Sequence, residues 1–248
     1  MKNINFLLIL ASILGMTVFT SCDEDPSVSD ISRVTLFPEF DYDGVNVAIV
    51  PCSTNYTLSP VVALENGVEL SSTTSVEGVY TGADAFDVNV SDKYEITTSA
   101  VNADGFPAEL NRTVWVVCTG DLVNSIEGLY TSTVARNGPN PTYFDLKYIL
   151  IRKVEGTTDQ YELSNADGGW YEFGRNLGPG YSSPGAIVTA NDIPSNSFSF
   201  GPPVPVNGFG GLITLTSMTV DPDAKTIVFT SDWTLGYTFT ATLTQVPI

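Results

Sequence analysis

Apolar residues alternate with hydroxyl residues along much of this chain, and this two-residue period is what most constrains its fold. Between residues 237 and 245 the side chains of Phe239, Ala241 and Leu243 alternate with threonines. Successive side chains of a β-strand point to opposite faces, so the pattern predicts a strand with one buried and one wet face. Nothing after residue 22 has the apolar spacing of a long amphipathic helix. We therefore predict an all-β protein.

Residues 31–118 form the first β-rich region. The turn Asn102-Ala103-Asp104-Gly105 separates its two clearest strands, because glycine readily takes the positive φ of such a turn. Seven short strands in a region of this length predict an immunoglobulin-like β-sandwich. The predicted strands are 32–37, 45–52, 61–65, 68–71, 87–90, 93–101 and 112–118.

Residues 119–125 read as a short linker or hinge, and residues 126–248 form the second region. Turn residues separate most of its strands, as in Asn165-Ala166-Asp167-Gly168-Gly169. Sequential strands with short loops predict an antiparallel meander, either a barrel or a sandwich, and a lipocalin-like shape is compatible with the pattern. The predicted strands are 128–136, 143–154, 160–164, 170–173, 186–190, 197–200, 212–220, 226–231 and 237–245.

One stretch of the first region resembles a known sequence motif. Residues 94–105 read YEITTSAVNADG, and residues 111–114 read NRTV. The phrase resembles the Ig-like repeats of bacterial surface proteins, which are common near the anchor of Bacteroidetes surface lipoproteins, including Sus-like nutrient-uptake systems. In such modules an early strand runs parallel to the last strand. The resemblance implies that Cys52 and Cys118 meet and form a disulfide in an exported protein, with two separate buried thiols as the alternative.

The N-terminus has the layout of a secretory signal, with Lys2, an apolar stretch at 6–19 and small residues before Cys22. The stretch is shorter than the roughly 20 residues of a membrane span. The cysteine makes residues 1–21 resemble a bacterial lipoprotein signal, which implies acylation of Cys22; the alternative is an ordinary signal with a chance cysteine. The acidic cluster 23–25, in a tether of residues 22–30, resembles the surface-export signal of Bacteroidetes lipoproteins. It implies an outer-membrane, lipid-anchored protein exposed at the cell surface, although short polar tails are commonly plain tethers.

Composition excludes several functions. The chain has ten Lys and Arg residues against 28 Asp and Glu, a formal charge of −18, and no histidine. Nucleic acid is therefore not a predicted partner, since no basic stripe can neutralise phosphates. Without histidine there is no Ser-His-Asp, Cys-His or histidine-based metal site. The acidic turns 41–44 and 221–223 lack a full calcium ligand set. We predict no catalytic residues, no metal and no cofactor.

The segment 168–185 is the strongest candidate for ligand binding. It places aromatic residues among glycines and prolines, and aromatic faces stack on sugar rings or apolar ligands. A second Gly/Pro-rich stretch, 201–211, is placed to lie beside it, and Trp233 and Tyr237 flank the final turn. The alternative is that the aromatic residues fill the core. The candidate binding residues are Trp170, Tyr171, Phe173, Arg175, Asn176, Tyr181 and Trp233.

The opening and closing phrases of the second region resemble the C-terminal β-domain of Bacteroidetes lipoproteins of unknown function. Together with the anchor, the resemblance implies a non-catalytic surface protein that takes part in glycan or nutrient acquisition. Its implied partners are the membrane, through the lipid, and a glycan or an outer-membrane transporter. The first alternative is a structural or adhesive module with protein–protein contacts. The second is a hydrolase that uses a carboxylate pair, but no spacing singles out such a pair.

Overall fold

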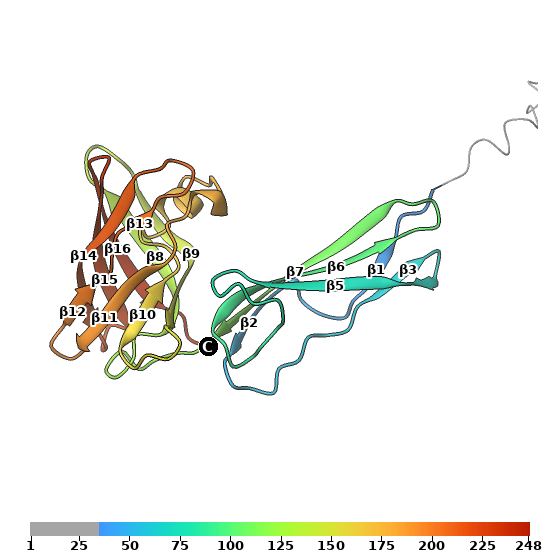
Figure 1. Ribbon diagram of the computed structural model, residues 1–248, viewed down its shortest axis with the longest axis horizontal. Coiled ribbons are helices and arrows are strands. Elements are labelled where there is room, and N and C mark those ends of the chain that lie inside the picture. The colour runs from blue at the N-terminus through green and yellow to red at the C-terminus, as the bar shows by residue number, and fades with distance from the viewer. Residues whose placement is uncertain (1–34) are drawn as a thin grey trace, which may run out of the picture. The chain divides into compact units, whose positions relative to one another are not determined.

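The computed structural model describes residues 35–248, and these residues form an all-β protein, as predicted (Figure 1). The residues from Pro38 to Ile248 make one compact unit. Two single-turn helices interrupt the strands, η1 at Trp170–Gly174 and η2 at Pro179–Tyr181. The predicted signal peptide, the acidic tether, Cys22 and residues 31–34 lie outside the described residues.

The first seven strands form two small sheets. One has the order β1-β3-β4 and the other has the order β2-β7-β6-β5. β2 runs parallel to β7, with Val47 opposite Thr113 and Pro51 opposite Val117, while the other pairs are antiparallel. The strands are β1 (Glu39–Asp41), β2 (Val47–Pro51), β3 (Val62–Glu65), β4 (Val68–Leu70), β5 (Ser72–Gly78), β6 (Asp92–Val101) and β7 (Pro107–Val117).

The parallel pair brings Cys52 and Cys118 together at the ends of β2 and β7. The two cysteines form a disulfide, and their Cα atoms are 4.9 Å apart. The backbone N–H of Cys52 also donates to the carbonyl of Val117 at 2.9 Å. The bond follows from strand register, because a parallel pair leaves both strands at the same edge of the sheet.

Alternation along β6 and β7 builds the core of this half. The side chains of Tyr94, Ile96 and Val116 are at most 1% exposed and pack with Val50 and Val114. Burying each such side chain contributes about 1.5–3 kcal/mol. Two outward residues of β6, Thr97 and Ser99, carry hydroxyl groups that pair across strands, as in the 3.1 Å hydrogen bond between Thr73 and Ser99.

Two local strand predictions in this half are wrong, because residues 35–37 and the predicted strand 87–90 are not strands. Two observed strands, β1 (Glu39–Asp41) and β5 (Ser72–Gly78), had no sequence prediction. β5 reads Ser-Thr-Thr-Ser-Val-Glu-Gly and is mostly exposed. It is an edge strand with few buried side chains, so it lacks the apolar alternation that marks a strand in sequence.

The remaining strands form one nine-stranded antiparallel sheet that curls into a half-barrel. Its order is β12-β11-β10-β9-β8-β16-β15-β14-β13, so the first and last strands of the region, β8 and β16, are neighbours in its middle. The strands are β8 (Gly128–Arg136), β9 (Thr142–Lys153), β10 (Gln160–Leu163), β11 (Ala186–Asp192), β12 (Ser197–Phe200), β13 (Val204–Pro205), β14 (Leu212–Asp221), β15 (Thr226–Trp233) and β16 (Tyr237–Gln245).

The two edges of this sheet are consecutive in the chain. Only Gly201-Pro202-Pro203 separates β12, which pairs with β11, from β13, which pairs with β14. The prolines have no N–H to donate to a neighbouring strand, so the ladder is interrupted there. The sheet is thus a single curled layer whose edges are joined by the chain, rather than a two-sheet sandwich.

Alternation fixes which face of the curled sheet is inside. In β16 the side chains of Phe239, Ala241 and Leu243 are fully buried, while Thr240 and Thr244 are exposed. They pack with Ile227 and Phe229 of β15 in one large core. The predicted pattern of a buried and a wet face is confirmed for this strand.

The predicted linker, residues 119–125, is fixed by a buried side chain and by hydrogen bonds to its backbone. Leu122 is 1% exposed and belongs to the core of the curled sheet. The Asp121 carboxylate accepts hydrogen bonds from the backbone N–H groups of Val123 and Asn124 at 2.9 and 2.7 Å. The segment is therefore a defined turn anchored in the core and not a free hinge.

Candidate functional site

The loop between β10 and β11, residues 164–185, folds into the curled sheet, and we call it the interior loop. Every residue from Ser164 to Tyr171 is buried. Two strand hydroxyls hold its backbone: Ser132 Oγ donates to the carbonyl of Gly168 at 2.8 Å, and Ser231 Oγ donates to that of Ala166 at 2.7 Å. Buried carbonyls need such partners, so these two serines fix the path of the loop.

Trp170 and Tyr171 are core residues, so of the two interpretations of this segment the structure selects the one in which these rings fill the core. They lie in η1 rather than in the predicted strand 170–173, and they are 0% and 5% exposed. The Trp170 ring lies 4.7 Å from that of Tyr143 and 6.2 Å from that of Phe239, centre to centre. Trp233 is only 5% exposed as well. Any internal ligand of the lipocalin kind would have to displace this loop.

A glycine allows the interior loop to approach the sheet. Gly168 has φ +69°, and a Cβ there would lie 2.6 Å from the Cβ of Ala241. That contact is too short for two carbon atoms. A residue with a side chain would therefore push the loop away from β16.

Rings from three separate segments gather at one end of the curled sheet. Strand direction explains this: β8 and β15 finish there, while β9, β14 and β16 start there, since each is antiparallel to its neighbour. The interior loop and the turns 137–141, 201–211 and 233–237 therefore meet. We call this surface the aromatic end; its rings are Tyr171, Tyr181, Phe209, Trp233 and Tyr237.

The rings of the aromatic end form a continuous cluster. Phe209 lies 4.6 Å from Tyr171, 5.0 Å from Tyr181 and 6.1 Å from Trp233, measured between ring centres. Tyr237 lies 5.8 Å from Trp233. Phe209 is 45% exposed and Tyr237 is 37% exposed, while the rings beneath them are buried or half-buried. The cluster thus offers two partly exposed rings on a base of buried and half-buried rings.

Arg136, at the end of β8, lies under this cluster. Its guanidinium carbon is 4.2 Å from the centre of the Tyr237 ring and 5.2 Å from that of Trp170. Nη1 donates to the Tyr171 hydroxyl at 2.8 Å, and Nη2 donates to Asn140 Oδ1 at 2.7 Å. Burial raises the pKa of Tyr171, and Arg136 opposes that rise. Arg136 therefore positions the interior loop, the turn after β8 and Tyr237 relative to one another.

Hydrogen bonds join the turns of the aromatic end. Asn207 N–H donates to the carbonyl of Ser182 at 3.0 Å, which ties the turn 201–211 to the interior loop. Trp233 Nε1 donates to the carbonyl of Gly210 at 3.1 Å. Thr238 N–H donates to Asn137 Oδ1 at 3.1 Å, which ties the last turn to the turn after β8. The ring faces are therefore held in place before any ligand arrives.

The other predicted binding residues lie around this end. Tyr181 is half-buried against Phe209, and Phe173 is half-buried against the core. Arg175 and Asn176 follow η1 and are exposed. The candidate set lacked Phe209, although it lies in the Gly/Pro-rich stretch 201–211. It also lacked Arg136, because one arginine at a strand end carries no sequence signal.

The interior loop also holds an unusual carboxyl group. Asp167 is 0% exposed, and its Oδ1 accepts the N–H groups of Gly169 and Trp170 at 2.8 and 3.0 Å. Its Oδ2 has no hydrogen-bond partner. Burial raises the pKa of Asp167 to about 7; the two amides oppose this and the charge of Glu172 adds to it. Asp167 is thus a buried acid that titrates near neutral pH.

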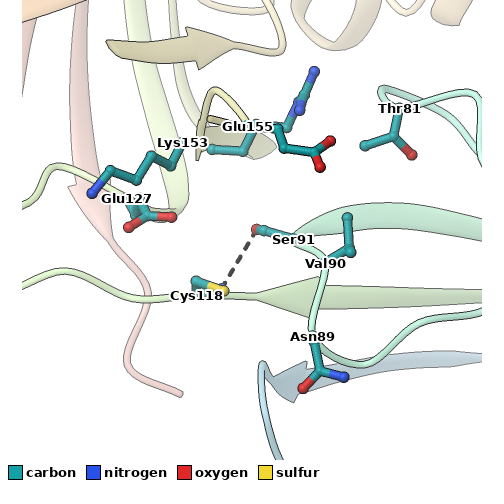
Figure 2. A pocket seen from close by; sticks show the side chains of 9 residues that line it. Thr81, Asn89, Val90, Ser91, Cys118, Glu127, Lys153 and Glu155 are labelled. Atoms are coloured by element: carbon teal, nitrogen blue, oxygen red, sulfur yellow. Dashed lines mark hydrogen bonds between the residues drawn. The ribbon is translucent and has the colours of Figure 1, made fainter. Parts of the chain in front are cut away.

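A separate pocket of about 280 Å³ lies between the turn before β6 and the last residues of β9. Figure 2 shows Lys153 and Glu127 on one side and Thr81 across from them. Cys118 of the disulfide also lines it, and its N–H donates to Ser91 Oγ at 3.4 Å. The side chains that line the pocket are Thr81, Asn89, Val90, Ser91, Cys118, Glu127, Arg152, Lys153 and Glu155, with no aromatic ring among them.

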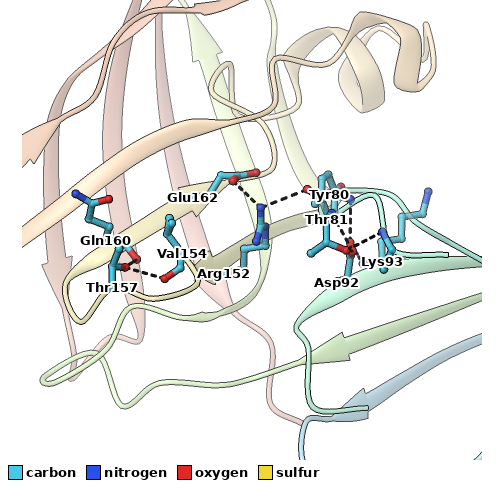
Figure 3. A network of polar contacts seen from close by, with 10 residues as sticks. Tyr80, Thr81, Asp92, Lys93, Arg152, Val154, Thr157, Gln160 and Glu162 are labelled. Atoms are coloured by element: carbon cyan, nitrogen blue, oxygen red, sulfur yellow. Dashed lines mark hydrogen bonds and ion pairs between the residues drawn. The ribbon is translucent and has the colours of Figure 1, made fainter. Parts of the chain in front are cut away.

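A polar network beside this pocket joins the two halves (Figure 3). Arg152 Nη2 forms an ion pair with Glu162 Oε2 at 2.6 Å and donates to the carbonyl of Tyr80 at 3.3 Å. Asp92 accepts the N–H groups of Tyr80 and Thr81 at 2.9 and 3.0 Å. Burial raises the pKa of Glu162, and Arg152 opposes that rise. Because Arg152 is already paired, we interpret this region as a structural contact between the two halves and call it the joint.

An apolar cluster supports the same joint. Trp115 and Val117 of β7 pack with Leu129 of β8 and Leu150 of β9, and all four are at most 6% exposed. The rings of Trp115 and Tyr148 meet edge to face at 5.8 Å. Since apolar burial and the hydrogen bond from Arg152 to Tyr80 both link the two halves, the joint is more than a covalent linker.

Within residues 35–248, no helix has the length and apolar character of a membrane span. Over the same residues, no three His, Cys, Asp or Glu side chains gather as metal ligands.

Comparison with known proteins places the second half in a family. A family model described as a "-like, C-terminal domain" matches residues 119–245, just over half of the chain. The chain belongs to that family. The match begins at the anchored turn that contains Leu122, so the family domain includes this turn along with the curled sheet. A search of curated protein sequences finds no match.

A solved structure shares the fold. It is that of the lipoprotein BT2262 from Bacteroides thetaiotaomicron, with a TM-score of 0.61 and 23% sequence identity. The alignment covers 84% of this chain and the whole of that one. Because the alignment extends well beyond residues 119–245, the shared fold also takes in strands of the first half.

Proposed function

We propose that this protein is a lipid-anchored bacterial surface protein that binds a glycan, without catalysis, as part of nutrient acquisition. The observation that carries the proposal is the aromatic end, where Phe209 and Tyr237 present open ring faces on a base of buried rings. Aromatic faces stack on the apolar faces of sugar rings. The signal that ends at Cys22 and the fold shared with a Bacteroides lipoprotein support the anchored location.

The architecture suits recognition without chemistry. The rings are fixed by Arg136 and by hydrogen bonds between turns, so little conformational entropy is lost when a ligand binds. The N-terminal sheets resemble Ig-like modules in sequence and lie between Cys22 and the curled sheet along the chain. We propose that they serve as the spacer of a Sus-like accessory protein.

Binding is tested by removing the two open rings. A glycan array identifies ligands, and calorimetry with the best oligosaccharide then compares wild type with Phe209→Ala and Tyr237→Ala. Each substitution should weaken binding about tenfold, because each removes one stacking surface. Phe144→Ala is the matched control, since that ring is 70% exposed on β9 and belongs to none of the ring pairs of the aromatic end. Equal affinity in all four proteins would place the ligand elsewhere.

The anchor is tested separately in cells. Cys22→Ala should abolish incorporation of labelled fatty acid and release the protein from membranes, since one acylated residue supplies the attachment. Protease added to intact cells should degrade the wild-type protein if it lies on the outer face. Protection from protease in intact cells, with membrane attachment retained, would place it on the periplasmic side.

The second candidate is a structural or adhesive module. The observation that favours it is the apolar character of the same end, where Leu212 and Leu235 are 44% and 57% exposed. Protein interfaces use such aromatic and apolar patches. A stable protein partner that is lost with Phe209→Ala, in the absence of any glycan binding, would select this candidate.

A further inference from the structure

Four segments of the aromatic end contain no charged residue. They are the turns 137–141, 201–211 and 233–237 and the last part of the interior loop, residues 176–185. The whole chain has 38 charged residues among 248, so about five would be expected in turns of this combined length. Surface turns normally carry charge, and these four segments carry none.

The charged groups that border these turns already have partners. Arg136 uses both Nη atoms on Tyr171 and Asn140, and its Nε is buried. Asp232 accepts the Thr238 hydroxyl at 2.6 Å, and Glu172 accepts the Asn165 amide at 3.0 Å. On β9, Lys147 lies 3.5 Å from Asp145. Arg175 is exposed next to the turn 176–185 and is the residue to test.

The groups left to contact a ligand are ring faces, amides and backbone groups. Gly210 has φ +75° and no atom within 4 Å of where a Cβ would lie, so its backbone is open to close approach. Such a surface matches an uncharged sugar, whose C–H face stacks and whose hydroxyls accept and donate hydrogen bonds. The four uncharged segments offer no fixed charge for a carboxylate or sulfate.

The net charge of the whole chain also disfavours the binding of anions. A formal charge of −18 makes the long-range field of the protein repel anions, an effect that salt screens. We infer that the aromatic end selects neutral saccharides and discriminates against acidic ones. This inference rests on the proposed function and adds the chemical class of the ligand.

The test uses matched pairs of oligosaccharides on the purified protein. Each pair has the same length and linkage and differs only in a neutral hexose or the corresponding hexuronate. The neutral member should bind at least about fivefold more tightly at low salt, and the preference should shrink at high salt. The affinity for the neutral member should change by less than about twofold between about 20 and 500 mM salt. Arg175→Gln should widen the preference for the neutral member, because it removes the exposed cation next to the turn 176–185.

The outcomes separate the inference from the proposed function. Tighter binding of the hexuronate, or a smaller preference for the neutral member in Arg175→Gln, overturns the inference while glycan binding stands. Equal binding of both members also overturns it. If no saccharide of either kind binds, and Phe209→Ala changes nothing, the proposed function itself fails.

Discussion

Replacing Asp167 by asparagine should remove a large pH dependence from the stability of this protein. The carboxyl group is fully buried in the interior loop, and its Oδ2 has no partner. Burial raises its pKa from 3.8 to about 7. A folded-state pKa above the unfolded value means that the folded form holds the proton more tightly. The associated stability is complete below about pH 4 and is lost as the pH rises to about 7.

The magnitude follows from the size of the shift. About three pKa units at 1.36 kcal/mol each amount to about 4 kcal/mol of stability between pH 4 and pH 7. Asparagine keeps an Oδ1 that can accept the N–H groups of Gly169 and Trp170, and it does not titrate. The variant should match wild type near pH 4 and exceed it by up to about 4 kcal/mol above pH 7.

The assay is urea unfolding followed by tryptophan fluorescence at several pH values from 4 to 8. Glu172 also has a raised pKa, mainly because of burial, but its contribution is present in both proteins and cancels to first order in the difference. Asp159→Asn, which makes the same substitution at an exposed carboxylate, is the control. A constant difference between Asp167→Asn and wild type across this range would refute the reasoning.

Three further predictions concern the framework. Trp170→Ala should destabilise the protein by about 4 kcal/mol in urea unfolding, because the ring is fully buried; unchanged stability would mean that it is not core. Replacing both Cys52 and Cys118 by alanine should cost about 4 kcal/mol, since the bond closes a loop of 66 residues, and reducing agent should then have no further effect. Arg152→Met should cost about 3 kcal/mol by leaving Glu162 unpaired, and the added Glu162→Gln should recover part of that loss if the pair acts as described.

The local residue pattern was enough to predict most of the strands and the inner face of the last one. The alternation of 237–245 places its apolar face inside, and the parallel pairing implied by the Ig-like phrase agrees with the disulfide of Cys52 and Cys118. The alternation of apolar and polar residues did not predict β5, because that strand buries few side chains. It also did not predict that the loop between β10 and β11 is itself buried inside the sheet. Residues 170–173 read as a strand because they are aromatic, yet they form a helical turn packed inside the sheet.

The candidate site was only partly visible in the sequence. The Gly- and Pro-rich segments 168–185 and 201–211 stood out, and the structure brings them together at the aromatic end. Which rings are open was not visible, since Trp170 and Phe209 both lie among glycines. The buried ring fills the core and the other is 45% exposed. Exposure depends on neighbours from β8, β15 and β16, which are far away in the chain.

The sequence by itself determined that this chain is all-β and which face of its regular strands is inside. Those properties depend on side-chain period and turn chemistry, which are local. Only the tertiary structure decided that the sheet curls around its own β10–β11 loop, and that four uncharged turns meet around Phe209 and Tyr237. Strand order and loop burial depend on contacts between residues distant in sequence, so no local pattern could specify them.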